Sequence, residues 1–213
     1  MRLHRGGRFR TWLGARLGGD FELGDRAWRR IIHSLGAAVL IYYPLPNDFF
    51  LVLPKAYVLL LALAVVVVLE VLRHWVALEL PTIRPYETDR VGSFAFFAVA
   101  IVAAILLFPM PIAAAVILGT SLVDPLAGEL RRSVRYRKLD PALPFAAYAG
   151  LALVGLVALG QWPLLGSVGL ALVAAAIAVA VEGPRFKWVD DDLAMILGPA
   201  VALYVLGVLI GRY

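Results

Sequence analysis

Residues 164–181 read LLGSVGLALVAAAIAVAV, a run of eighteen residues without a charged side chain. Six further apolar blocks occur along the chain, so the predicted spans are residues 31–43, 56–72, 91–108, 111–126, 142–159, 164–181 and 193–210. A membrane-spanning helix needs about 20 apolar residues, and its backbone must satisfy its own hydrogen bonds because lipid offers no partners. We therefore expect an all-α, polytopic integral membrane protein with about seven transmembrane helices.

The overall composition excludes a water-soluble or a disordered protein. Hydrophobic residues make up 62% of the 213 residues and charged residues only 16%, whereas soluble domains have roughly 45–50% apolar and about 25% charged residues. The chain contains no cysteine. Disulfides, thiolate metal sites and cysteine nucleophiles are therefore excluded.

The basic residues are distributed unevenly between the predicted loops. Eighteen of the twenty lie in residues 1–30 or after the second, fourth and sixth spans, and only Lys55 and Arg212 lie on the other side. By the positive-inside rule, the N-terminus is cytoplasmic and the C-terminus is outside. This orientation accounts for the basic excess, so no nucleic-acid partner is expected. The absence of a targeting peptide favours a prokaryotic plasma membrane.

We divide the chain into two parts. Residues 1–25 contain several arginines and form either a basic cytoplasmic tail or an interfacial helix on the anionic inner leaflet. Residues 26–213 form a single transmembrane domain without an internal repeat.

Ionisable side chains gather at the predicted cytoplasmic ends of the spans, and Asp124 is the most informative of them. It lies inside the fourth predicted span, next to Pro125 and between Gly119 and Gly128. A carboxylate within a span is costly and tends to mark function. Proline removes a backbone donor, so we expect the helix to be broken or kinked here, as in ion or phosphate sites of membrane proteins. The alternative is an interfacial aspartate that caps a helix.

Two clusters flank the first and second spans. Arg29 and His33 share a helix face, while Arg30 points elsewhere. Taken alone, these residues fit ordinary basic flanking of a span. Glu70 and Arg73 are three residues apart and suit either a site or a mutual ion pair.

Acidic residues surround the start of the seventh span. Asp190, Asp191 and Asp192 are consecutive, and Glu182 closes the preceding span. Three successive carboxylates suit Mg²⁺ held together with phosphate oxygens. They also suit an N-cap cluster at a helix N-terminus.

These residues, in this order, resemble the polyprenol kinase family, which includes dolichol kinase, phytol kinase and CTP-dependent diacylglycerol kinases. The resemblance covers residues 26 to 205. The matching elements are Arg29-Arg30-Ile31-Ile32-His33, the pair Glu70 and Arg73, the residues Arg84, Glu87 and Gly92, the stretch Val123-Asp124-Pro125-Leu126-Ala127-Gly128, and Glu182 followed by Asp191-Asp192-Leu193. Val123 and Asp192 stand where the family has glycine and asparagine, and residues 138–144 lack its Lys-Ser-x-Glu-Gly-Ser stretch.

The resemblance implies phosphorylation of the hydroxyl of a membrane isoprenoid alcohol, with CTP as donor. Such transfer depends on positioning and on charge neutralisation, commonly by Mg²⁺. No P-loop motif is present. The candidate residues are Asp124 and His33 for catalysis; Arg29, Arg30, Thr120, Gly128, Arg131 and Lys138 for the nucleotide phosphates; Asp124, Asp191 and Asp192 for the metal; and Glu70, Arg73, Arg84, Glu87 and Glu182 in support.

Two other functions remain open from the sequence. A lipid cytidylyltransferase also brings a nucleoside triphosphate and Mg²⁺ to a membrane lipid, but releases pyrophosphate and makes a CDP-lipid. A small transporter or structural membrane subunit is the non-enzymatic alternative. Transporters usually carry polar residues near mid-membrane, whereas the outer halves of these spans are almost purely apolar.

Overall fold

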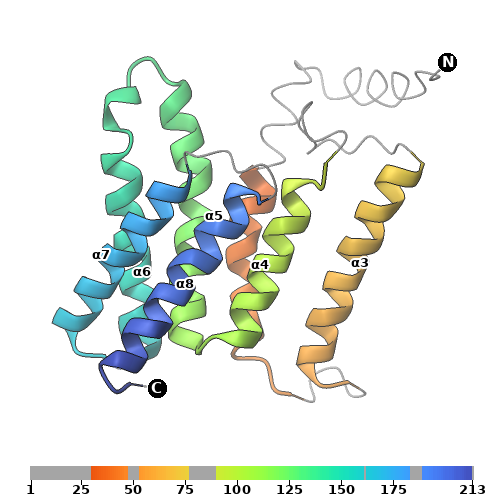
Figure 1. The fold of residues 1–213 in the computed structure, drawn as a ribbon, viewed down its shortest axis with the longest axis horizontal. Helices are drawn as coiled ribbons and strands as arrows, with labels where there is room; N and C mark the ends of the chain where they lie inside the picture. The colour runs from red at the N-terminus through yellow and green to blue at the C-terminus, as the bar shows by residue number, and fades with distance from the viewer. Residues whose placement is uncertain (1–29, 48–52, 77–89, 161, 183–188, 213) are drawn as a thin grey trace.

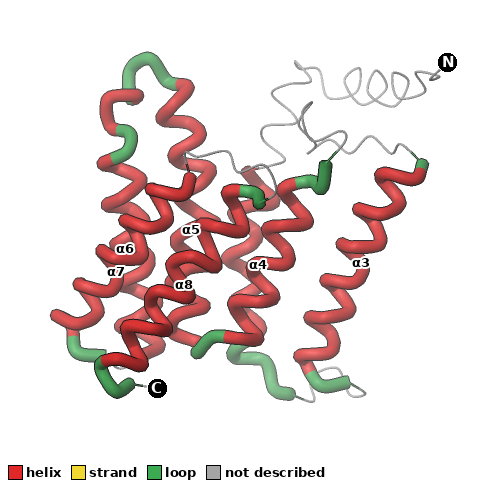
Figure 2. The backbone as a smooth tube through the Cα atoms, in the orientation of Figure 1, coloured by secondary structure: helices red, strands yellow, loops and turns green. Residues whose placement is uncertain are grey.

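The computed structural model describes residues 30–47, 53–76, 90–160, 162–182 and 189–212. Every predicted apolar block in these ranges forms a helix (Figures 1 and 2). The helices are Arg30–Tyr42, whose second half is the 3-10 helix η1 (Ala37–Tyr42), then α3 (Lys55–Trp75), α4 (Ser93–Leu107), α5 (Met110–Arg132), α6 (Ala142–Gly160), α7 (Leu164–Glu182) and α8 (Asp191–Leu209). A short 3-10 turn, η3 (Arg137–Leu139), lies between α5 and α6.

Five of these helices are long and apolar enough to cross a membrane, namely α3, α5, α6, α7 and α8. Helix Arg30–Tyr42 and α4 are apolar but shorter. A short apolar helix can still span if the bilayer thins locally. The all-helical, membrane-compatible class is thus confirmed, while seven spans and a cytoplasmic N-terminus stay predictions.

Helix α5 forms the centre of the bundle. In the most apolar 18-residue stretch of each helix, 61% of the residues of α5 are buried, compared with 6% of those of α3. It packs against helix 30–42, α4, α6, α7 and α8, whereas α3 packs mainly against α4 (Figure 1). The inner helices are lined by small side chains, and close approach of backbones is a common basis of helix association in lipid.

The contact between α5 and α6 depends on Gly155. A Cβ atom at this position would lie 2.7 Å from the backbone nitrogen of Ala115 and 2.8 Å from its Cα. No side chain can occupy that space unless the two backbones separate. Gly155 therefore sets the distance between the central helix and its main neighbour.

Successive helices run in alternating directions (Figure 1). His33 and Asp192 lie near the beginning of their helices, and Glu70 and Glu182 lie near the end of theirs. Asp124 lies in the second half of α5. These side chains are therefore brought to the same end of the bundle, which we call the charged end. This sidedness is the arrangement expected from the alternating loop charges.

Of the two outcomes expected at Pro125, a break or a kink, the break is wrong. Helix α5 runs without interruption from Met110 to Arg132 and contains Pro125 in its interior. Proline removes only the one hydrogen bond that its nitrogen would donate to the residue four positions earlier. In a bundle, packing against neighbouring helices holds the remaining turns in place.

Candidate functional site

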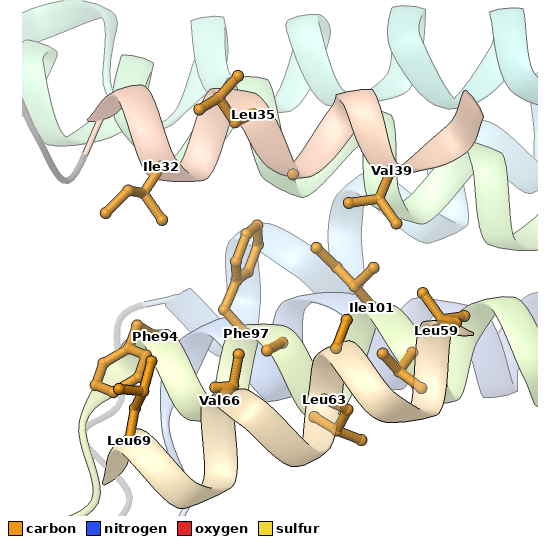
Figure 3. A pocket seen from close by; sticks show the side chains of 14 residues that line it. Ile32, Leu35, Val39, Leu59, Leu63, Val66, Leu69, Phe94, Phe97 and Ile101 are labelled. Carbon is orange, nitrogen blue, oxygen red and sulfur yellow. The ribbon is translucent and has the colours of Figure 1, made fainter. Parts of the chain in front are cut away.

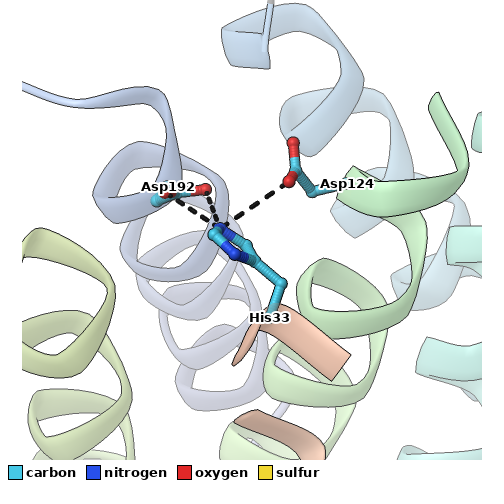
Figure 4. A group of neighbouring side chains, drawn as sticks. All are labelled: His33, Asp124 and Asp192. Carbon is cyan, nitrogen blue, oxygen red and sulfur yellow. Dashed lines mark hydrogen bonds and ion pairs between the residues drawn. The ribbon is translucent and has the colours of Figure 1, made fainter. Parts of the chain in front are cut away.

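Three side chains from three different helices meet at the charged end (Figure 4). His33 comes from helix 30–42, Asp124 from α5 and Asp192 from α8. The Nε2 atom of His33 lies 3.1 Å from both carboxylate oxygens of Asp192 and 3.7 Å from Oδ2 of Asp124. One ligand atom from each residue lies within 4.8 Å of the others. The structure thus brings together three residues that the sequence separates by up to 159 positions.

The imidazole of His33 is held by packing as well as by hydrogen bonds. The His33 and Asp192 side chains are each 4% exposed, whereas that of Asp124 is 21% exposed. The ring of Phe97 stacks on His33 with a centroid distance of 4.5 Å. A Cβ atom at Gly36 would lie 2.6 Å from the Phe97 ring. Glycine at this position therefore lets helix 30–42 approach α4 closely enough for the stacking.

A buried hydrogen-bond group lies one turn below the three side chains. Pro199 is inside α8 and has no N–H to donate to the carbonyl of Met195, four residues earlier. The hydroxyls of Thr120 and Tyr148 donate to this carbonyl instead, at 3.0 and 3.2 Å. The carbonyl thereby joins α5, α6 and α8. Because Thr120 is one turn from Asp124, the group fixes Asp124 relative to α8.

The N-terminus of α8 has the capping arrangement expected as one alternative. Asp190 is the N-cap, and its Oδ1 accepts a hydrogen bond from the backbone N–H of Asp192 at 3.1 Å. Burial, together with the adjacent carboxyls of Asp191 and Asp192, raises the pKa of Asp190 to about 8. The cap directs the first turn of α8 so that Asp192 faces His33, while Asp191 is half-buried beside it.

The donor set fits a divalent cation. Asp124 and Asp192 offer carboxylate oxygens from two helices, and Mg²⁺ is usually bound by one or two carboxylates together with substrate phosphates. Mg²⁺ prefers oxygen, so the nitrogen of His33 is not required as a ligand. Its hydrogen bond to Asp192 instead orients one of the two carboxylates.

Two of the predicted phosphate-binding cations, Arg30 and Arg131, have carboxylate partners in the structure. Arg30 forms an ion pair with Glu129 of α5. Arg131 lies 2.8 Å from Oε1 of Glu182 and 3.2 Å from Oδ2 of Asp140. These pairs lie at the charged end, and the Arg30 and Arg131 side chains are 39% and 41% exposed. Lys138 is exposed on η3.

Two other predicted nucleotide residues have different environments. Thr120 is fully buried and donates to Met195. In this placement its hydroxyl joins α5 to α8. Gly128 faces open space, where a Cβ atom would meet nothing within 4 Å.

Glu70 and Arg73 form the mutual ion pair that was expected as one alternative. Arg73 donates to both oxygens of Glu70, at 2.9 and 2.6 Å, and both side chains are buried. Glu70 also accepts the backbone N–H of Gly92, which joins the end of α3 to the start of α4. Three other candidates, Arg29, Arg84 and Glu87, lie outside the described residues.

Four residues of this region were not singled out by the sequence. Glu129 and Asp140 are partners of arginines, and a partner is not visible before the fold is known. Phe97 is one aromatic among many apolar residues. Tyr148 could have been found from the sequence, because it is the only polar side chain in residues 142–159. A buried hydroxyl in a span needs an acceptor.

Comparison with known proteins gives no match: no protein-family model, no curated protein and no solved structure matches the chain. The functional argument therefore rests on the geometry described above and on the motifs of the sequence.

Proposed function

We propose that this protein transfers a phosphoryl group from a nucleoside triphosphate to the hydroxyl of a membrane isoprenoid alcohol. The observation that carries the proposal is the meeting of His33, Asp124 and Asp192 within 4.8 Å at the charged end. The motifs that resemble the polyprenol kinase family support it, and they indicate CTP as the donor. In this proposal the charged end faces the cytoplasm of a prokaryotic cell, where nucleotides are found.

The carboxylates of Asp124 and Asp192 would hold Mg²⁺. When bound, the metal would supply positive charge that neutralises the charge developing on the phosphate oxygens during transfer. Asp124 is the more exposed of the two and faces the end from which a nucleotide enters. Asp192 is buried and holds His33.

His33 would accept the proton of the acceptor hydroxyl. The alcohol oxygen forms a bond to the γ-phosphorus, and the bond between that phosphorus and the β–γ bridging oxygen breaks. The hydroxyl proton passes to Nδ1 of His33, because Nε2 carries the hydrogen that is donated to the carboxylate of Asp192, and the nucleoside diphosphate leaves. Asp192 stabilises the resulting imidazolium through the contact at 3.1 Å.

The phosphates would be neutralised from the exposed rim of the site. Arg30 lies three residues before His33 and one turn away from it. Its side chain is 39% exposed, and an exposed ion pair contributes only about 0–1 kcal/mol. A triphosphate could therefore replace Glu129 as its partner at little cost.

The experiment offers the purified protein Mg²⁺, a panel of isoprenoid alcohols, and CTP, ATP, GTP or UTP labelled on the γ-phosphate. We expect the label to enter the lipid, and Asp124→Asn to abolish its incorporation without unfolding the protein. Glu129→Gln is the matched control, because it neutralises an exposed carboxylate five residues further along α5. It releases Arg30 for the phosphates and should therefore not lower the incorporation. Wild-type activity in Asp124→Asn would remove that residue from the site. A parallel assay uses CTP labelled on the α-phosphate, and entry of that label without the γ-label would identify a cytidylyltransferase.

A further inference from the structure

An apolar groove lies between helix 30–42, α3 and α4 (Figure 3). Its volume is about 590 Å³, and its fourteen lining residues include no polar side chain. Along α3 it extends from Leu59 to Leu69. Ten residues of helix correspond to about 15 Å, which is about half of a 30 Å hydrocarbon core and so the depth of one leaflet.

Helix α3 forms one wall of this groove and is held to the bundle by polar contacts at its two ends. At one end, Nζ of Lys55 donates to the carbonyls of Tyr42 and Leu45, at 3.2 and 2.8 Å. At the other end, Glu70 accepts the N–H of Gly92 at 2.9 Å. Little of α3 between these contacts is buried. The wall is thus fixed at both ends while its middle remains separated from helix 30–42.

The groove reaches the candidate site through one residue. Phe97 lines the groove and also stacks on the imidazole of His33. A molecule that fills the groove along Phe97 therefore brings its end next to His33. The groove is apolar throughout and its end lies beside polar groups, which matches a molecule with a hydrocarbon tail and a polar terminus.

We infer that this groove binds the tail of the acceptor alcohol, with the hydroxyl beside His33. The inference rests on the proposed function, and it adds where the tail of the alcohol binds and how long that tail can be. Because bilayer lipid is as apolar as the groove, hydrophobicity alone does not favour binding. Selection comes from the shape of the groove and from the polar end, so tails that fit within one leaflet are preferred over much longer polyprenols.

The inference is tested by photocrosslinking the full-length protein in nanodiscs, without nucleotide. The probe is a geranylgeraniol analogue that carries a diazirine at the end of its tail, and labelled residues are mapped by mass spectrometry. We expect labelling around Leu59 and Val39, at the end of the groove away from His33, and competition by unlabelled geranylgeraniol.

Variants on the two walls of the groove provide the controls. Leu63→Trp on α3 and Ala98→Trp on α4 fill the groove and should lower groove labelling to the yield seen on the exposed face of α7. Leu61→Trp is the matched control, since Leu61 lies on the same helix, is 59% exposed and does not line the groove. It should leave labelling unchanged. Because the two tryptophan variants lie on different helices, the test remains informative if one of them fails to fold.

The outcomes separate this inference from the proposed function. Equal labelling of the groove and of α7, or an effect of Leu61→Trp as large as that of Leu63→Trp, would overturn the lipid site. Groove labelling that is present in nanodiscs holding one copy of the chain and lost in nanodiscs holding two would assign the groove to self-association and also overturn it. Specific labelling of the groove in a protein that transfers no phosphate from any nucleotide would support the lipid site and refute the kinase.

Discussion

Replacing Gly155 with alanine should destabilise the protein, whereas the same replacement at Gly150 should stabilise it. Both glycines lie in α6. A Cβ atom at Gly150 would meet nothing within 4 Å, but at Gly155 it would lie 2.7 Å from a backbone nitrogen of α5. The two variants therefore make the same chemical change in the same helix and differ in the space that receives the methyl group.

The magnitude follows from two opposing effects. Alanine in place of glycine in a helix interior contributes roughly 0.5–1 kcal/mol of stability. Forcing an extra carbon into a packed interface costs about 1–3 kcal/mol, and here the neighbouring atoms belong to the backbone of Ala115, which cannot rotate away. The helix effect cancels in the comparison of the two variants. Gly155→Ala should thus be about 1–3 kcal/mol less stable than Gly150→Ala.

The measurement is the free energy of unfolding in mixed micelles, obtained by titration with a denaturing detergent and followed by circular dichroism. Wild type and both variants are compared under identical conditions. If the two alanine variants agree within about 0.5 kcal/mol, the extra methyl group costs less than the overpacking range. The close contact between α5 and α6 would then be incorrect, and so would the central position of α5.

Three further predictions address other features. Thr120→Val and Tyr148→Phe should each lower the free energy of unfolding by about 1 kcal/mol. The double variant should lose more than the sum of the two, because only then does the buried carbonyl of Met195 lose both donors. Strictly additive losses of unfolding free energy would refute the shared acceptor. With chelator present, stability should fall as the pH rises from about 4 to 8, because the raised pKa of Asp190 means that folding favours its protonated form. Asp190→Asn keeps a good N-cap and should flatten that profile in thermal unfolding. In the cysteine-free chain, Lys138→Cys and Arg212→Cys should react with an impermeant maleimide from opposite sides of the membrane, because the three helices α6, α7 and α8 lie between them. Reaction of both from one side would exclude three spans in this part of the chain.

The positions of the helices could be predicted from sequence, but their ends could not. The apolar block 111–126 became α5, which continues to Arg132, and block 56–72 became α3, which continues to Trp75. Hydropathy marks only the part of a helix that contacts lipid or the core. Intrahelical hydrogen bonds continue into the polar end regardless of lipid, so charged residues that looked like loop became the last turn.

Which side chains meet could be predicted only in part. The alternation of apolar blocks placed His33, Asp124 and Asp192 at one end, but spacing along the chain does not state which helices are neighbours. The expectation that Arg131 holds phosphate did not include its two acidic partners, because Asp140 comes within reach only through the path of the loop after α5. The local sequence indicates the charge of a side chain and its depth along a span. Which charged side chains form ion pairs depends on how the helices pack.

Under the proposed function, two substrates of opposite character would have to reach one site. A nucleoside triphosphate is charged and must arrive from water, at the charged end where Asp124 is partly exposed. An isoprenoid alcohol remains in the bilayer and must arrive from the side, where the middle of α3 stands apart from helix 30–42. His33 contacts a carboxylate through Nε2 and an aromatic wall of the apolar groove through its ring face. A reaction between a soluble phosphate donor and a lipid hydroxyl requires a residue at that boundary, and His33 is in that position.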